Sequence, residues 1–318
     1  MNNIKAAMVV VYFGNFPNYF QLFLNSLSKS KVLDLILYTD NTQVYDYPSN
    51  VKVIHGSLEK IKSMMIEKIK MEINLSKPYK LCDFKTMYGY IFEERLKEYD
   101  YWGYGDLDVI YGDVDGLLYP LFSQGYDKVF DLGHCSFIKN TFENNRLFFK
   151  SPVLKDILQS DDIFIFDEQY TNSINNIFID YGKTLYVNSL AADIDKWGQI
   201  LKVTSYNHKT RTFEVEHKKS LFVYNSGKLL KIYIEKDKIV SKEYLYIHLQ
   251  LRKMKINNTN NDFFKIISNQ FADLEIDINQ IDIRNFNQIN LGFWNSQKII
   301  LRTKMISNTI KRKLGIIK

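Results

Sequence analysis

The first 73 residues alternate between two hydrophobic patterns, and this alternation restricts the fold more than any other feature of the sequence. Residues 6–13 are continuously apolar and contain three consecutive valines, which is typical of a strand buried on both faces of a parallel sheet. Residues 20–27 and 58–73 instead carry apolar side chains at helical spacing. Two further strands are predicted at 33–39 and 51–55. We therefore expect an α/β fold, in which helices flank both faces of a mostly parallel sheet.

The later part of the chain continues this pattern and then changes to short strands. A helix is predicted at 83–96, a strand at 101–104 and either a strand pair or a strand followed by a loop within 128–137. Further short strands are predicted at 185–187, 213–216, 220–224 and 229–234, and a hairpin turn at 225–227 joins the last two. Polar residues at 257–261 suggest a boundary, so we expect one domain at 1–256 and a C-terminal helical extension at 257–318.

Composition excludes other classes of protein. The chain has 318 residues, of which 46% are hydrophobic, and its 14 Gly and 5 Pro argue against disorder. Two distant cysteines, Cys82 and Cys135, do not form a disulfide framework and favour a reducing cytoplasm. The net charge is +6, but residues 298–318 carry seven basic residues and no acid, so the rest of the chain is close to neutral. This distribution argues against a broad nucleic-acid surface.

We expect no segment of the chain to cross a membrane. The apolar run near the N-terminus is too short to span a bilayer, and it passes into Tyr12-Phe13-Gly14 without a cleavage-like site. No stretch of 18 apolar residues occurs elsewhere. The expected location is therefore the cytoplasm, and any membrane contact is expected to be peripheral, on the inner face of the plasma membrane.

The strongest local motif is an acidic pair, Asp106 and Asp108, directly after the aromatic strand at 101–104. In open α/β sheets, ligands bind beyond the carboxyl ends of the strands, which is where this order places the pair. Two carboxylates in a non-helical turn can share one hard divalent cation, and that cation can bridge the phosphates of a nucleoside diphosphate. The alternative interpretation is a solvated acidic turn without a ligand.

This turn resembles the D-x-D turn of the GT-A class of glycosyltransferases, which have a Rossmann-like fold. More narrowly, the chain is similar to a bacterial family encoded with capsule and lipopolysaccharide genes. The resemblance depends on four blocks between residues 80 and 253: 80–89 (KLCDFKTMYG), 100–113 (DYWGYGDLDVIYGD), 166–168 (FDE) and 246–253 (YIHLQLRK). The N-terminal strand pattern extends it to the start of the chain, and the C-terminal 60 residues lie outside it. The resemblance implies a GT-A-like domain that uses a nucleotide-sugar donor.

The resemblance also implies a metal site. Asp108 would hold Mn²⁺ or Mg²⁺ with His248, and Asp106 would assist as a ligand or through the ribose or water. Arg252 or Lys253 would offset the charge of the diphosphate. Because His248 lies in an apolar, strand-like run, a hydrogen-bonded core histidine is the alternative.

Nucleotide contacts are expected from the N-terminal and central segments. By the resemblance, the nucleotide lies over the N-terminal sheet near Phe13 and Asp40. Asp83 and Lys85 are candidates to contact its base, ribose or phosphates. The alternative for Asp83 is a helix N-cap, and the alternative for Lys85 is a solvated position.

Asp167 and Glu168 are the candidates for the catalytic base, because the resemblance places the base in their block. An inverting transferase needs a carboxylate that accepts the proton of the acceptor hydroxyl while its oxygen attacks the anomeric carbon. We favour Asp167, with Glu168 as the alternate. The structural alternative is Asp167 as the N-cap of a following helix.

These features together predict a metal-dependent glycosyltransferase. We expect it to move a galactose-type hexose, pyranose or furanose, from a UDP-linked donor to a glycan or lipid-linked glycan of a surface polysaccharide, with inversion. Two alternatives stay open. Another nucleotide-dependent transferase would usually carry a Gly-rich phosphate loop, and the sequence has no G-x-x-x-x-G-K-[ST]. A non-catalytic carbohydrate-binding protein fits the 15% aromatic content but would not need the paired acids.

The C-terminal segment has the pattern of a basic amphipathic helix. Five apolar residues fall near one helical face beside the seven cations: Ile299, Ile306, Ile310, Leu314 and Ile317. A helix of this kind can lie on anionic lipid. The alternative is a solvated terminal helix packed on the domain.

Overall fold

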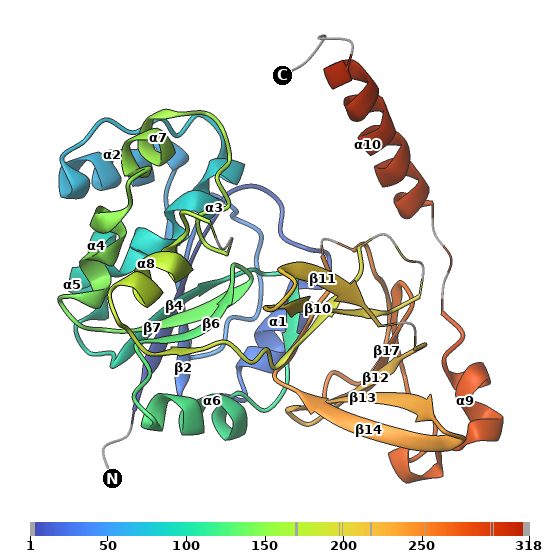
Figure 1. Cartoon of the computed structure of the whole chain (residues 1–318). Helices are drawn as coiled ribbons and strands as arrows, with labels where there is room; N and C mark the ends of the chain where they lie inside the picture. Colours follow the sequence, from blue (N-terminus) through green and yellow to red (C-terminus); the bar gives the residue numbers. More distant parts are fainter. Residues whose placement is uncertain are drawn as a thin grey trace. The chain divides into compact units, whose positions relative to one another are not determined.

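The computed structural model describes residues 4–168, 171–196, 198, 200–216, 218–250, 252–292, 294 and 296–313 (Figure 1). The chain forms two compact units, and each is assembled from separate parts of the sequence. The first unit comprises Met1–Phe16, Phe23–Leu107 and Asp113–Ser189. The second comprises Pro17–Leu22, Asp108–Gly112 and Leu190–Lys318.

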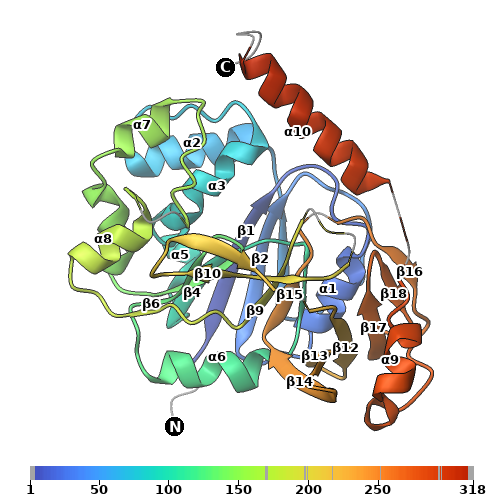
Figure 2. The same cartoon turned by 45° about the vertical axis from the view of Figure 1, so that its right-hand side comes forward.

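The first unit contains a seven-stranded, mostly parallel sheet, as predicted. Strands β3, β2, β1 and β4 lie side by side in parallel (Figure 2): Val51–His55, Leu33–Thr39, Ala6–Tyr12 and Tyr101–Gly105. The order continues with β7, antiparallel to β4, then β6 and β8: Cys135–Lys139, Lys128–Leu132 and Leu185–Tyr186. The strand pair predicted within 128–137 is therefore the β6–β7 hairpin.

Helices cover both faces of this sheet, which confirms the expected layering. Neighbouring residues of a strand point to opposite faces. On one face, Trp102 of β4 packs so closely on Gly89 that a Cβ there would come within 2.2 Å of the indole. On the other face, the ring of Tyr101 stacks on Phe122 of α6 (Val114–Ser123), with ring centroids 4.4 Å apart.

The helix predicted at 83–96 is interrupted into short segments: α3 (Leu81–Phe84), η2 (Lys85–Met87), α4 (Tyr88–Ile91) and α5 (Glu93–Leu96). The predicted helix at 58–73 is confirmed but shorter, because α2 (Leu58–Ile69) ends at Lys70, whose φ of 59° is left-handed. The other helical segments of this unit are η1, η3, α7 and α8: Pro78–Lys80, Asn144–Lys150, Leu154–Gln159 and Ile174–Asp180. Helix α1 (Phe20–Leu27) contributes residues to both units.

The second unit is built from two sheets. The five-stranded sheet has the order β11-β10-β9-β15-β5: Thr212–Val215, Val203–Asn207, Ala191–Ile194, Tyr246–His248 and Val109–Tyr111. The six-stranded sheet has the order β14-β13-β12-β17-β18-β16: Lys238–Tyr244, Lys228–Glu235, Leu221–Asn225, Phe263–Ile267, Gln270–Ala272 and Lys255–Asn257. Apolar residues of both sheets, such as Ile247 and Phe264, share one buried core.

The hairpin turn predicted at 225–227 is confirmed between β12 and β13. Ser226 and Gly227 have positive φ angles of 47° and 94°, as a type I′ turn requires. The polar segment proposed as a domain boundary lies inside the second unit, where it connects β16 to β17 of the same sheet.

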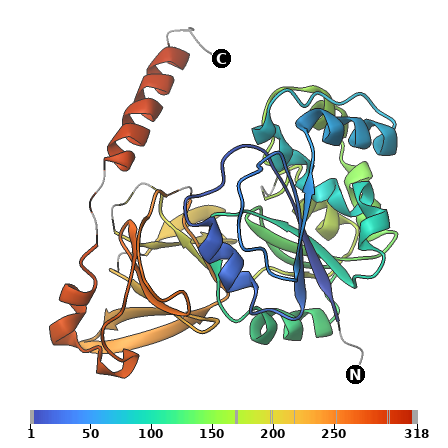
Figure 3. The same cartoon turned by 180° about the vertical axis from the view of Figure 1, so that it is seen from behind.

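Beyond the last strand, the described part of the second unit begins with the short helix η4 (Ile278–Gln280). It contains α9 (Ile283–Ile289) and α10 (Gln297–Lys313), which is one continuous helix in Figures 1 and 3. Leu314, Ile317 and Lys318, which the sequence assigns to the amphipathic segment, lie outside the described residues. Among the helices in the described ranges, none is long and apolar enough to cross a bilayer.

Candidate active site

Each acid of the D-x-D motif belongs to a different group of ionisable side chains, and each group lies in one unit. Asp106 belongs to the first unit and Asp108 to the second, although only Leu107 separates them in the chain. Each group is described within its own unit below.

In the first unit, Lys85 connects the D-x-D motif to the predicted base. Its Nζ donates to Asp106 Oδ1 at 2.7 Å and to the backbone carbonyl of Gly133 at 3.1 Å, and lies 3.8 Å from Asp167 Oδ2. The Lys85 side chain is only 16% exposed, so the solvated alternative is wrong. Burial opposes its charge, but Asp106 and Asp167 outweigh burial and raise the pKa of Lys85.

Asp167 has the electrostatic properties of a general base. It is 3% exposed, and this burial raises the pKa of Asp167 to about 7. Lys85 acts in the opposite direction, whereas Glu168 and Asp106 add to the rise. A carboxyl group that titrates near neutrality can accept a proton at physiological pH and release it again.

The backbone of Gly133 organises both candidate bases. Its N–H donates to Glu168 Oε2 at 3.0 Å, while its carbonyl accepts from Lys85. A Cβ at this position would come within 2.2 Å of Asp167 Oδ2, so only glycine lets the carboxylate approach the turn between β6 and β7. Asp167 is not a helix N-cap, because α8 begins at Ile174 and Ser173 caps it.

Asp83 holds the segment that precedes the candidate base and has no exposed surface. Its carboxylate pairs with Lys80 at 2.9 Å and accepts from the backbone N–H groups of Phe164 and Phe166 at 3.1–3.2 Å. This burial argues against the expected nucleotide contact. The N-cap alternative is also wrong, because α3 begins at Leu81.

The two N-terminal candidates follow neighbouring strands: Phe13 follows β1, and Asp40 follows β2. Asp40 is exposed, and its Oδ1 accepts from the backbone N–H of Gly14 at 2.8 Å. Gly14 has a φ of 100°, which glycine adopts without strain. Phe13 is partly buried against the core of the first unit. The hydrogen bond therefore joins the loops at the carboxyl ends of β1 and β2, where α/β proteins bind ligands.

In the second unit, His248 lies between two carboxylates. It is the last residue of β15 and is in register with Asp193 of β9 and Val109 of β5. Its Nδ1 donates to Asp193 Oδ1 at 2.8 Å, and its Nε2 lies 3.3 Å from Asp108 Oδ1. Gln250 Nε2 also donates to Asp193, at 2.7 Å.

This arrangement fits a metal ion. A histidine that binds a metal through one ring nitrogen usually donates its other N–H to a carboxylate, and Asp193 serves that role for His248. Nε2 then faces Asp108, which is 4% exposed. Burial opposes the charged form, but the two carboxylates raise the pKa of His248 well above its usual value. Asp108 and His248 belong to the side chains that could hold a cation.

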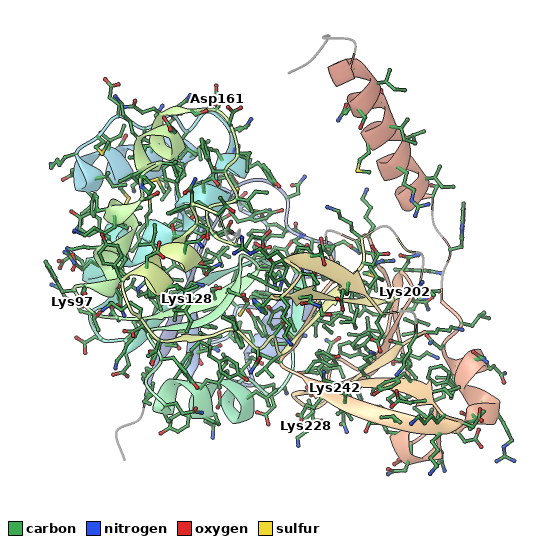
Figure 4. The ribbon with its side chains drawn as sticks, viewed as in Figure 1. Lys97, Lys128, Asp161, Lys202, Lys228 and Lys242 are labelled. Atoms are coloured by element: carbon green, nitrogen blue, oxygen red, sulfur yellow. The ribbon has the colours of Figure 1, made fainter. Side chains whose placement is uncertain are left out.

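Sequence reasoning missed Asp193 and a buried lysine. Asp193 begins a second D-x-D, Asp193-Ile194-Asp195, after an apolar start, and this spacing could have identified it. Lys128 of β6, which Figure 4 labels, is fully buried, and burial lowers the pKa of Lys128 to about 8. Its Nζ donates to the backbone carbonyl of Phe130 at 2.6 Å. No motif in the sequence distinguishes this lysine from a solvated one.

The two cations expected at the diphosphate differ in exposure. Arg252 is 1% exposed and donates to Asn269 Oδ1 at 2.8 Å and to the carbonyls of Asp195 and Gly198 at 3.0 Å. The guanidinium therefore fastens loops within the second unit, which argues against the expected phosphate contact. Lys253 is exposed.

Two solved structures are similar to the chain. Mouse xyloside xylosyltransferase 1 in its apo form is 12% identical, with a TM-score of 0.36, over 61% of this chain and 88% of that protein. The galactosyltransferase LgtC, in complex with donor and acceptor sugar analogues, is 10% identical, with a TM-score of 0.31, over 60% of this chain and 75% of that protein. At these TM-scores, the similarity assigns no activity to this chain.

No curated protein matches the sequence. The expected membership of a capsule and lipopolysaccharide family stays a prediction. Residues 8–275 match the family of unknown function DUF6625, and because this match spans most of the sequence, the chain belongs to that family.

Proposed function

We propose that this protein is a metal-dependent glycosyltransferase that uses a nucleotide-sugar donor. The observation that carries the proposal is the pair formed by Asp108, the second acid of the D-x-D motif, and His248, whose ring Asp193 orients. The mostly parallel sheet that ends at the motif agrees with the GT-A-like fold expected from the sequence.

The proposed metal ligands are Asp108, His248 and Asp106, which lies two residues before Asp108 in the chain. Carboxylate oxygens and an imidazole nitrogen suit Mn²⁺, and Mg²⁺ is the alternative. When bound, the cation would neutralise charge on the departing diphosphate.

Asp167 is the proposed base. Its carboxylate would accept the proton of the acceptor hydroxyl while that oxygen bonds to the anomeric carbon and the bond to the nucleoside diphosphate breaks. The proposal is supported by the pKa of Asp167, about 7, and by Lys85 and Gly133, which fix the surroundings of the carboxylate. Glu168 is the alternate base. Direct attack on the donor would invert the anomeric configuration.

The donor is proposed to be UDP-linked, with a galactose-type hexose favoured. Phe13 and Asp40 would lie near the nucleotide, because they follow the carboxyl ends of the neighbouring parallel strands β1 and β2. Lys85 is already paired with Asp106, so it would contact the phosphates only after exchanging that partner. Lys253 is the proposed counter-charge of the diphosphate, because Arg252 is buried.

The acceptor is proposed to be a glycan, or a lipid-linked glycan at the inner face of the plasma membrane. The support is α10, in which every side chain with a described environment is exposed, including Ile299, Ile306 and Ile310. Its sequence between 297 and 313 contains basic residues and no acid. An exposed basic helix with isoleucines on one face is suited to an anionic lipid surface.

A donor screen tests the proposal directly. The full-length protein would be heated with a panel of nucleotide-sugars, with Mn²⁺ or with excess EDTA, and hydrolysis of each donor would be measured in parallel. We expect one nucleotide class to raise the melting temperature only with Mn²⁺, because ligand at 100 times its Kd adds about 2.7 kcal/mol of stability. The proposal is wrong if no nucleotide-sugar stabilises the protein or is hydrolysed.

A further inference from the structure

The β10–β11 hairpin of the second unit exposes an aromatic surface. Phe213 of β11 is 56% exposed and Val215 is 38% exposed. The ring of Tyr206 on β10 packs edge-on against both Phe213 and His208, with ring centroids 5.1 Å apart in each pair. We define Tyr206, His208 and Phe213 as the aromatic hairpin.

Strand register places this surface on the same sheet face as His248, one of the proposed metal ligands. Residues directly opposite each other in neighbouring strands share a face. His248 is paired with Asp193, Asp193 with Thr204, and Thr204 with Val215. Thr204 Oγ1 also donates to Asp193 Oδ2 at 2.8 Å, which confirms that the two side chains lie together.

The aromatic pair lies one step further along the same face. Tyr206 is two residues after Thr204, so its side chain returns to that face about 7 Å along the strand. Phe213 is directly opposite Tyr206. On the other face, the exposed side chains of the hairpin are polar, since Asn207 Nδ2 donates to Glu214 Oε1 at 2.7 Å, and Val203 is buried in the core. The hairpin therefore directs its apolar side toward the face that carries the carboxylate–histidine group.

An apolar edge strand that faces water is a liability for a folded protein, because it favours aggregation. Here the apolar residues are confined to one face and continue a row of polar ligand candidates. The exposed face of an aromatic ring beside polar groups suits a sugar ring, whose C–H face is apolar and whose hydroxyls need hydrogen-bond partners. The continuity with the proposed site identifies a glycan as the occupant rather than a second protein strand.

We propose that Phe213 and Tyr206 form a stacking platform for a sugar ring of the glycan acceptor. That the bound glycan is the acceptor rests on the proposed function, whereas glycan binding by the hairpin is independent of it. The same chemistry could come from the sugar of the donor, so the experiment separates the two sources.

The test uses the full-length protein on an array of defined oligosaccharides, without nucleotide-sugar and without divalent cation. We expect the wild type to bind at least one glycan and Phe213→Ala to bind it about tenfold more weakly. Phe213→Tyr should restore binding, because the ring is kept. Phe142→Ala removes a phenylalanine of the first unit that is more exposed, at 74%, and Ser205→Ala alters the polar face of β10, so both should bind like the wild type.

The inference is overturned if the wild type binds no glycan, or if Phe213→Ala binds as the wild type does. It is also overturned if Phe213→Ala changes only the oligomeric state, which would make β11 a protein interface. A rise in KM for nucleotide-sugar hydrolysis with unchanged glycan binding would assign the platform to the donor. If the protein binds glycans through Phe213 but hydrolyses no nucleotide-sugar, the platform stands and the proposed transferase function fails.

Discussion

Each unit contains one basic side chain between two aspartates, and the basic side chain differs between the units. In the first unit, Lys85 lies between Asp106 and Asp167; in the second, His248 lies between Asp108 and Asp193. A lysine keeps its proton near neutral pH, so it balances one carboxylate permanently and leaves Asp167 free to titrate near pH 7. A histidine can lose its proton and bind a metal, which leaves two carboxylates that a divalent cation would balance.

The comparison shows how a protein can divide one set of residue types between two tasks. The first-unit group is suited to proton transfer, because one fixed cation faces a buried carboxyl group of raised pKa. The second-unit group is suited to cation binding, because its central base gives up its charge when a metal arrives. Five experiments would break or sharpen this distinction.

The largest effect is expected for Asp108→Ala. This change removes the carboxylate that faces His248 Nε2, so metal binding and metal-dependent nucleotide binding should both be lost. Losing a cation that stabilises the departing diphosphate costs several kcal/mol, on the order of 10⁴-fold or more in transfer rate. Transfer assays and Mn²⁺ calorimetry would measure it, with the exposed Asp156→Ala on α7 as the control. Full activity of Asp108→Ala, or of wild type in excess EDTA, would contradict the assignment.

The next effect is expected for Asp167→Asn. Loss of a general base should lower kcat by about 10²–10⁴-fold and leave donor binding intact. Because the pKa of Asp167 is raised when folded, wild-type stability should fall as pH rises from about 4 to about 7, and the neutral Asn should not show this decline. Kinetics and melting curves across pH measure both. If Asp167→Asn stays active while Glu168→Gln is inactive, Glu168 is the base.

A smaller effect is expected for Asp193→Asn, which perturbs the orientation of His248 without removing a proposed ligand. The loss of an orienting carboxylate should weaken metal affinity by about 10–100-fold. Saturating Mn²⁺ should restore most of the transfer rate, unlike in Asp108→Ala. Glu214→Gln, on an exposed position of β11, is the control. Unchanged Mn²⁺ affinity would show that Asp193 does not orient His248 for metal binding.

The pH at which kcat/KM rises should differ modestly between wild type and Glu168→Gln, and this difference separates the two candidate bases. Wild-type kcat/KM should rise with pH through about 7, because Asp167 acts as a base only when deprotonated. The charge of Glu168 raises the pKa of Asp167, so Glu168→Gln should move this rise to lower pH while transfer continues. A rise at the same pH in wild type and variant would exclude Asp167 as the titrating group.

The smallest effect on chemistry is expected from removing residues 297–318. Hydrolysis of the donor should be unchanged, whereas binding to phosphatidylglycerol vesicles should be lost. Each basic side chain near such a surface contributes about 1 kcal/mol, which salt weakens. Vesicle sedimentation at low and high salt measures this, and the triple change of Ile299, Ile306 and Ile310 to Ser separates the apolar from the electrostatic part. Equal sedimentation of full-length and truncated protein would make α10 an ordinary solvated helix.

Hydrophobic periodicity predicted the first-unit sheet well, because its strands are long, buried on both faces and separated by helices of regular spacing. The strands at 33–39 and 51–55 have their predicted bounds, and the turn at 225–227 has the positive φ angles that its glycine and small polar residues favour. The strands β9 and β10 were not predicted, because short segments with polar residues give a weak hydrophobic periodicity.

The sequence by itself determined which residues could carry chemistry, because the D-x-D motif, His248 and the Asp167-Glu168 pair are visible as residue types at informative positions. Only the tertiary structure decided which of them are accessible and with what partners. It buries Asp83 and Arg252 in structural hydrogen bonds, and it brings Asp193, 55 residues away, to the ring of His248. The physical reason is that pKa values, orientation and burial depend on distances across strands, and those distances are set by register and packing rather than by spacing along the chain.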